Sequence, residues 1–134
     1  MSEQHDVIET GTAKLERVDG VIEIHFDPNM KVSIAGMSEV VRAKSDLCAV
    51  EELDVLAVLP EDLELELNVL AVDHHKVNGG CGLARRLALV ANSTFNERLA
   101  SIYFRYHPRP HETKVFLNEA DARRWLATRP VSEN

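Results

Sequence analysis

The sequence predicts one α/β domain with an N-terminal β-hairpin, a mostly parallel mixed sheet of about five strands and about four helices. Three observations support this fold class. An Asp-Gly pair separates two β-prone runs, strand-like apolar runs then alternate with helical patterns, and the stretch from Arg86 to Leu126 reads strand-helix-strand-helix. Two strands joined through a helix run parallel, so the second strand of that stretch needs a parallel sheet to join.

Size and composition favour a single globular unit. The 134 residues contain 45% hydrophobic residues, which is typical of a globular protein. We assign residues 12–130 to the domain and expect residues 1–11 to be flexible, because they carry few apolar side chains. Cys48 and Cys81 form no C-x-x-C pair and are interpreted as buried thiols.

Charge and hydropathy exclude several classes of partner. The net charge of −7 repels phosphate backbones, so we expect no nucleic-acid partner. No apolar run approaches the roughly 20 residues of a membrane span, and the polar start lacks the features of a signal peptide. We therefore expect a cytoplasmic protein without a membrane partner.

The N-terminal hairpin is predicted around Asp19 and Gly20, between Ala13–Val18 and Val21–Phe26. An Asp-Gly pair favours a two-residue turn because both of its positions require positive φ. Alternation along the second strand gives it one core face and one more polar face. The core face carries Ile22, Ile24 and Phe26.

A helix is predicted next, from about Ser33 to Leu47, because apolar residues recur there at helical spacing. The nearly continuous apolar run Leu53–Leu59 then predicts a strand covered on both faces, which Pro60 ends. The following segment is ambiguous. Alternation over Leu63–Leu67 fits an edge strand, but we prefer a helix over Glu66–Lys76, because Glu, Leu and Ala are good helix formers.

The last unit has clearer boundaries. We predict strands at Leu87–Ala91 and Lys114–Leu117, with helices at Thr94–Tyr106 and Glu119–Ala127. Thr94 and Glu97 match a capping box, with Asn92 and Ser93 as competing caps, and Asn118 caps the last helix. On the first of these helices, the apolar face predicted to meet the sheet carries Phe95, Leu99, Ile102, Tyr103 and Tyr106.

The residues of this unit resemble a known superfamily. The element order and the local pattern Ala88-Leu89-Val90, Tyr103-Phe104, Pro108-x-Pro110, Lys114-Val115-Phe116 and Ala122-x-x-Trp125-Leu126 resemble the STAS-like superfamily of bacterial anti-sigma-factor antagonists, in an uncharacterised bacterial branch. The detailed likeness covers about the last third of the chain. It implies a STAS-like fold and no catalytic role.

The resemblance also implies a phosphorylated Ser just after Leu59, and this chain departs from it there. No Ser or Thr occurs between Ser45 and Ser93, so we expect no phosphoserine switch at that place. Glu61 and Asp62 put fixed negative charge near the position, where a solvated turn after Pro60 is the simpler reading.

No residue cluster predicts a metal, a cofactor or a catalytic centre. His74 and His75 are adjacent and share no helix face, and no second Cys joins Cys81 to complete a zinc site. Prolines between His107 and His111 prevent a helix from aligning that pair. The glycine-rich segment 78–82 lacks the ending of a P-loop and is read as a flexible connection.

Two functional hypotheses follow. The leading one is a non-enzymatic regulatory or protein-interaction module, a homodimer or a complex with another protein, whose surface is an outward Phe104 beside Ala100, Arg105 and His107. The alternative for Phe104 is that the loop Pro108–Pro110 folds back and covers it.

The alternative is a small-molecule (apolar or acyl) binding protein or an enzyme. Its pocket would lie between the sheet and the helices Thr94–Tyr106 and Ser33–Leu47, near the carboxyl ends of the strands. The predicted rim consists of Glu61, Asp62, Asn92, Ser93 and Asn118.

Overall fold

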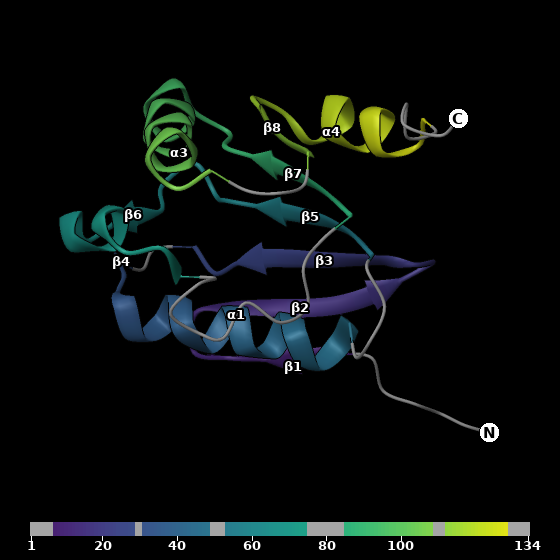
Figure 1. The fold of residues 1–134 in the computed structure, drawn as a ribbon, viewed down its shortest axis with the longest axis horizontal. Coiled ribbons are helices and arrows are strands. Elements are labelled where there is room, and N and C mark those ends of the chain that lie inside the picture. Colours follow the sequence, from purple (N-terminus) through teal and green to yellow (C-terminus); the bar gives the residue numbers. More distant parts are fainter. Residues whose placement is uncertain (1–6, 29–30, 49–52, 75–84, 109–111, 129–134) are drawn as a thin grey trace.

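The predicted hairpin is formed by β2 (Ala13–Val18) and β3 (Val21–Phe26), which pair antiparallel with Val18 opposite Val21. Asp19 (φ 49°) and Gly20 (φ 80°) both adopt the left-handed conformation that the two-residue turn requires. The computed structural model describes residues 7–28, 31–48, 53–74, 85–108 and 112–128 (Figure 1).

The N-terminus holds one more strand than the sequence suggested. Residues 7–9, expected to be flexible, form β1 (Val7–Glu9), which pairs antiparallel with β2. Ile8 is half-buried against the core, and this contact holds the segment on the sheet although its neighbours Val7 and Glu9 are exposed. Residues 1–6 lie outside the described residues.

The main sheet has six strands in the order β1-β2-β3-β5-β7-β8. β5 (Asp54–Val58), β7 (Arg86–Val90) and β8 (Glu112–Phe116) continue parallel to β3. Because β7 and β8 are parallel neighbours, the strand-helix-strand unit predicted for the last part of the chain is confirmed. Every residue of β5 is buried, as its apolar run predicted.

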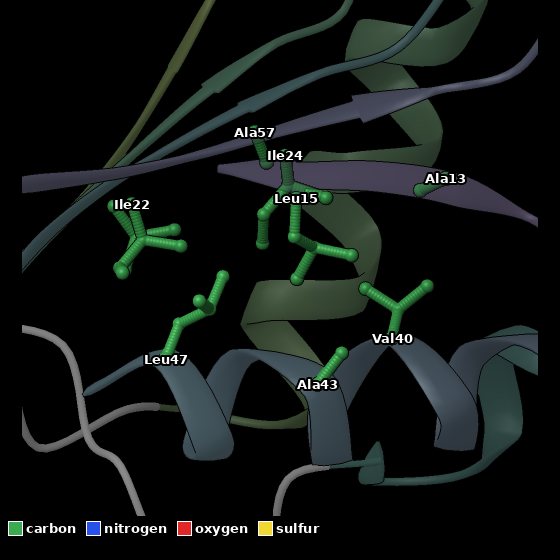
Figure 2. Close-up of a cluster of buried hydrophobic side chains, with 9 residues drawn as sticks. Ala13, Leu15, Ile22, Ile24, Val40, Ala43, Leu47 and Ala57 are labelled. Carbon is green, nitrogen blue, oxygen red and sulfur yellow. The ribbon is translucent and has the colours of Figure 1, made fainter. Parts of the chain in front are cut away.

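The helix α1 (Ile34–Cys48) covers the β1–β3 half of one sheet face (Figure 1). Figure 2 shows Val40, Ala43 and Leu47 pointing from α1 toward the side chains of β2 and β3. The start of α1 lies so close to the strands that a Cβ on Gly36 would come within 2.5 Å of Thr12 Oγ1. Glycine at this position therefore lets the helix lie against the sheet.

The helix α4 (Glu119–Leu126) covers the opposite face, over β5 and β7. Its cap is the predicted one, because Asn118 Oδ1 accepts a hydrogen bond of 2.9 Å from Asp121 N. Ala122 is fully buried against the sheet, and the rings of Trp125 and Phe116 pack with centroids 5.7 Å apart. Ala122, Trp125 and Leu126 therefore form the side of this helix that packs against the sheet.

The segment after β5 differs from its prediction. The preferred helix, Glu66–Lys76, includes residues 75 and 76, which lie outside the described part of the chain. The described residues form instead a short strand, β6 (Glu64–Leu65), and a 3₁₀-helix, η1 (Leu67–Ala71). The alternative prediction, an edge strand over Leu63–Leu67, is partly correct, because β6 pairs with β4 (Lys31–Val32). Elements this short leave no readable periodicity in a sequence.

The element count is corrected accordingly. The described residues form a six-stranded sheet and a two-stranded one, where about five strands were predicted. They form three α-helices, α1, α3 (Thr94–Tyr106) and α4, where about four were predicted. The other predicted strands and helices lie within two residues of the observed ones.

Candidate functional site

An apolar cavity of about 170 Å³ lies between α1, α3 and the face of the sheet that both helices cover. Among the described residues the cavity is partly open. Its floor comes from β3, β5 and β7, and η1 with its neighbours bounds it between the two helices (Figure 1). The lining residues are Ile24, Phe26, Met37, Val40, Val41, Lys44, Val55, Ala57, Leu59, Leu65, Val69, Leu70, His74, Leu87, Leu89, Asn96, Ala100, Tyr103 and Phe104.

The cavity exists because the two helices stand apart over the middle of the sheet. Strand β7 shows this directly, since its side chains alternate between the two faces. Ala88 and Val90 are fully buried beneath α4, whereas Leu87 and Leu89, on the other face, are only half-buried and line the cavity. A central strand in a parallel sheet is normally covered on both faces, so this exposure identifies a place for an additional apolar group.

The start of α3 is fixed at the carboxyl ends of β5 and β7. Ser93 is the N-cap and accepts a hydrogen bond of 3.0 Å from Asn96 N, so the competing cap Ser93 is confirmed and the capping box at Thr94 is wrong. Asn92 adopts φ 61° and its Nδ2 donates to Leu59 O at 2.8 Å. These contacts determine which side of α3 faces the sheet.

Asn96 is the polar residue that α3 presents to the cavity. Its side chain is 2% exposed, and Nδ2 donates to Pro60 O at 3.5 Å. Asn96 was not predicted as a site residue, because a polar side chain argues against a buried helix face. No local pattern identifies it, since its burial depends on the carbonyl of Pro60 from another segment.

Two histidines join η1 to α3 at one end of the cavity. His74 Nε2 donates to Val69 O at 2.8 Å, and His107 Nε2 donates to Leu70 O at 3.0 Å. Tyr103 lies between them, with ring centroids 5.9 Å from His74 and 4.7 Å from His107, and its hydroxyl accepts from His74 N. His74 therefore has a structural role, holding η1 and α3 together.

The orientation of α3 is opposite to the predicted one. Ala100 is buried, and Phe104 is half-buried and lines the cavity, so neither forms the outward surface that was expected. Arg105 is exposed, whereas His107 is half-buried against η1. Apolar residues occur around most of this helix, so the number of large side chains does not determine which face meets the sheet. The tertiary contacts at Asn92 and Asn96 determine it instead.

The predicted pocket rim is also displaced. None of its five residues lines the cavity, which lies against the sheet face rather than beyond the strand ends. Glu61 and Asp62 form an exposed turn, while Asn92, Ser93 and Asn118 hold local backbone positions at the starts of helices. What the prediction located correctly is the pair of helices that bound the pocket.

A buried ionic cluster lies at the opposite ends of the strands. Asp54 is buried and accepts hydrogen bonds from Arg86 Nη2 at 2.8 Å and Arg85 Nη2 at 3.1 Å. Burial alone would raise the pKa of Asp54, but the two guanidinium groups outweigh it and hold that pKa below its ordinary value. Arg86 also donates to Trp125 O and Leu126 O, so the cluster anchors the end of α4.

Several candidate residues fall outside the described part of the chain: His75, the segment 78–82 with Cys81, and His111. Among the described residues, no three His, Cys, Asp or Glu side chains are grouped as metal ligands. No helix in the described ranges has the length and apolar character that a membrane span requires.

Comparison with known proteins bears on the fold. A crystal structure of an uncharacterised protein of the DUF3478 family from Shewanella loihica PV-4, with a SpoIIAA-like fold, superposes with a TM-score of 0.56 at 17% identity. The alignment covers 95% of this chain and 98% of that one. The predicted STAS-like fold is therefore confirmed.

The sequence comparisons add a family. No curated protein matches the chain. Residues 14–129 match a family described as a domain of unknown function, DUF7793. Because that match covers most of the 134 residues, the chain belongs to the DUF7793 family.

Proposed function

We propose that this protein is a non-enzymatic STAS-like module that binds a small apolar molecule in the cavity between the sheet and the helices α1 and α3. The observation that carries the proposal is the half-buried pair Leu87 and Leu89, central sheet residues that face an apolar space of about 170 Å³. Apolar cavities of about 150 Å³ stay dry and take up benzene, so this one suits a substituted ring or a short acyl chain.

The polar groups around the cavity support binding rather than catalysis. Asn96, His74 and Tyr103 all make hydrogen bonds with backbone atoms that hold α3 and η1 in place. In a binding pocket, a few polar groups of this kind fix the walls while apolar side chains supply the contact area.

The test is a binding titration with indole and with hexanoate. Calorimetry and shifts in the amide NMR spectrum are used to detect binding. We expect saturable binding of at least one probe, with shifts concentrated on Leu87, Leu89, Ala100 and Phe104. The variant Ala100→Leu fills the cavity from α3 and should weaken binding at least tenfold. The control Ser101→Leu adds the same side chain at an exposed position of the same helix and should leave binding unchanged.

Two outcomes would contradict the proposal. The first is the absence of saturable binding at millimolar concentrations of either probe. The second is equal weakening by Ala100→Leu and Ser101→Leu, since that would place the probe outside the cavity.

A second candidate, the protein-interaction module, is supported by a different observation. The side of α3 that faces away from the cavity carries large apolar residues in contact with solvent, among them Phe95 and Tyr106. This surface does not include Phe104, so the interaction hypothesis now concerns the opposite side of the helix.

A further inference from the structure

The outer side of α3 carries an unusual share of the exposed apolar surface. Of the five large hydrophobic residues that are exposed in the described part of the chain, three lie on this helix: Phe95 (69% exposed), Ile102 (41%) and Tyr106 (72%). Leu99, half-buried, lies between them. We call these four residues the outer stripe. In Figure 1, α3 stands at the margin of the molecule.

The spacing of the outer stripe is the same from either end. Its members are separated by four, three and four residues, which places them on one helix face. Read in either direction, the order is aromatic, aliphatic, aliphatic, aromatic. In an antiparallel contact between two identical subunits related by a twofold axis, residue i meets residue j while j meets i, so this order pairs aromatic with aromatic and aliphatic with aliphatic side chains.

We propose that the outer stripe binds a second copy of the same chain, with the two α3 helices antiparallel. Phe95 then packs on Tyr106 of the second copy, and Leu99 packs on Ile102 of the second copy. This inference is independent of the cavity, because the residues of the stripe do not line it.

The available area sets the strength of this dimer. At about 200 Å² for each large side chain, the exposed parts of the stripe amount to roughly 350 Å² per copy. A stable interface buries about 800 Å² per partner, so the stripe supplies less than half of that area. The neighbouring polar residues must contribute the rest. We therefore expect a weak dimer whose population depends on protein concentration.

Charge distinguishes a second copy from an acidic partner. Arg98 and Arg105 are exposed on the same flank of the stripe, and neither makes an ion pair with another described residue. The antiparallel arrangement brings the arginines of both copies to one side of the interface, where they repel each other. Salt screens this repulsion, so added salt should strengthen the dimer. Binding to an acidic partner would weaken with salt.

Sedimentation velocity over a range of concentrations is the first test. We expect wild type to shift from monomer toward dimer with increasing concentration, and more so at higher salt. Phe95→Glu should weaken association at least tenfold. Leu117→Glu is the matched control, because Leu117 is 48% exposed and lies outside α3. A wild type that stays monomeric at 1 mM, or equal effects of the two variants, would overturn the proposal.

Disulfide trapping tests the antiparallel geometry. Positions 95 and 106 are about 16 Å apart along a single helix, whereas the Cα atoms of a disulfide lie within about 7 Å, so a bond between them must join two copies. We expect oxidised Phe95→Cys/Tyr106→Cys to give the 95–106 linkage in peptide maps, where Cys48 and Cys81 are distinguishable. A 95–95 linkage alone indicates parallel helices, and either that result or no linkage contradicts the proposal. Circular dichroism of the oxidised and reduced variant checks the fold.

Discussion

The two faces of the main sheet are packed differently, although the same strands build both. Under α4, the side chains of Leu56, Ala88 and Val90 have no exposed surface. On the other face, Leu87 and Leu89 of the same strand β7 are half-buried beside a cavity. One helix placed directly over the central strands excludes solvent completely, whereas two helices that share a face leave a space between them. The difference shows that packing here depends on helix placement rather than on strand composition.

Small side chains explain the tight face. Ala122 of α4 and Ala88 of β7 are both fully buried, so the helix can approach the strands closely. At the end of α4, the guanidinium of Arg86 lies 5.3 Å from the centre of the Trp125 ring. On the α3 side, the buried Ala100 faces the cavity.

The largest expected difference between the faces comes from truncating leucines. Leu56→Ala removes a fully buried side chain from the tight face and should lower the free energy of unfolding by about 4 kcal/mol. Leu89→Ala should cost only about 1–2 kcal/mol, because that side chain is half-buried and borders a space that already exists. Urea unfolding followed by circular dichroism measures both, and equal losses would contradict the comparison.

Removing the arginine that anchors α4 should have the next largest effect. Arg86→Ala leaves the buried Asp54 carboxylate with only the half-exposed Arg85, and should cost about 3 kcal/mol. Arg85→Ala is the control, and we expect it to cost less than about 1 kcal/mol because that side chain is solvated. Thermal unfolding of both variants checks the order. A larger loss of stability in Arg85→Ala than in Arg86→Ala would mean that the buried pair of Arg86 and Asp54 does not hold α4.

A matched pair of alanines compares the faces from the helix side. Ala122→Leu inserts a large side chain where none fits and should destabilise the protein by about 2 kcal/mol. Ala100→Leu places the same group in the cavity, so its cost should be near zero or negative. Differential scanning calorimetry gives both values. Destabilisation of the same size in the two variants would show that the α3 face has no room.

The smallest expected effect is a pH dependence confined to the α4 face. Arg123 of α4 donates a hydrogen bond of 2.9 Å to Glu23 of β3 and lowers the pKa of Glu23, against its partial burial, from 4.5 to about 2. The charged carboxylate therefore stabilises the fold above about pH 4.5, and this contribution is lost as the pH falls toward 2.

Glu23→Gln should remove this part of the acid sensitivity. Because Arg123 is exposed, we expect the loss of unfolding free energy between pH 6 and pH 3 to shrink by less than about 1 kcal/mol in this variant. Urea unfolding at the two pH values measures that loss. His25 Nε2 lies 3.0 Å from Glu23 Oε1, so His25→Gln is measured in parallel. An unchanged difference in Glu23→Gln would contradict the assignment to Glu23.

Much of the fold could be predicted because local chemistry determines it. Asp19 and Gly20 have the positive φ angles that their turn demands, and Asn118 caps α4 through its own side chain. The apolar run of β5 is long enough to require cover on both faces. In each case a few neighbouring residues carry the information, and no distant contact changes the outcome.

The orientation of α3 could not be predicted in this way. Large apolar residues occur on both its sides, from Phe95 on the outer one to Phe104 on the inner one, so hydrophobic periodicity does not select a face. The choice depends on Asn96, whose amide meets the carbonyl of Pro60. The cavity could not be predicted either, because its volume depends on the distance between two helices that are far apart in sequence.

The sheet order has a consequence for folding kinetics. Only Asp19 and Gly20 connect β2 to β3, and a hairpin of this kind closes within about 1–10 μs. Roughly 30 residues separate β5 from β7, so that pairing carries a larger loop-closure entropy. We expect the antiparallel half to form first and to serve as the template on which β5, β7 and finally β8 are added.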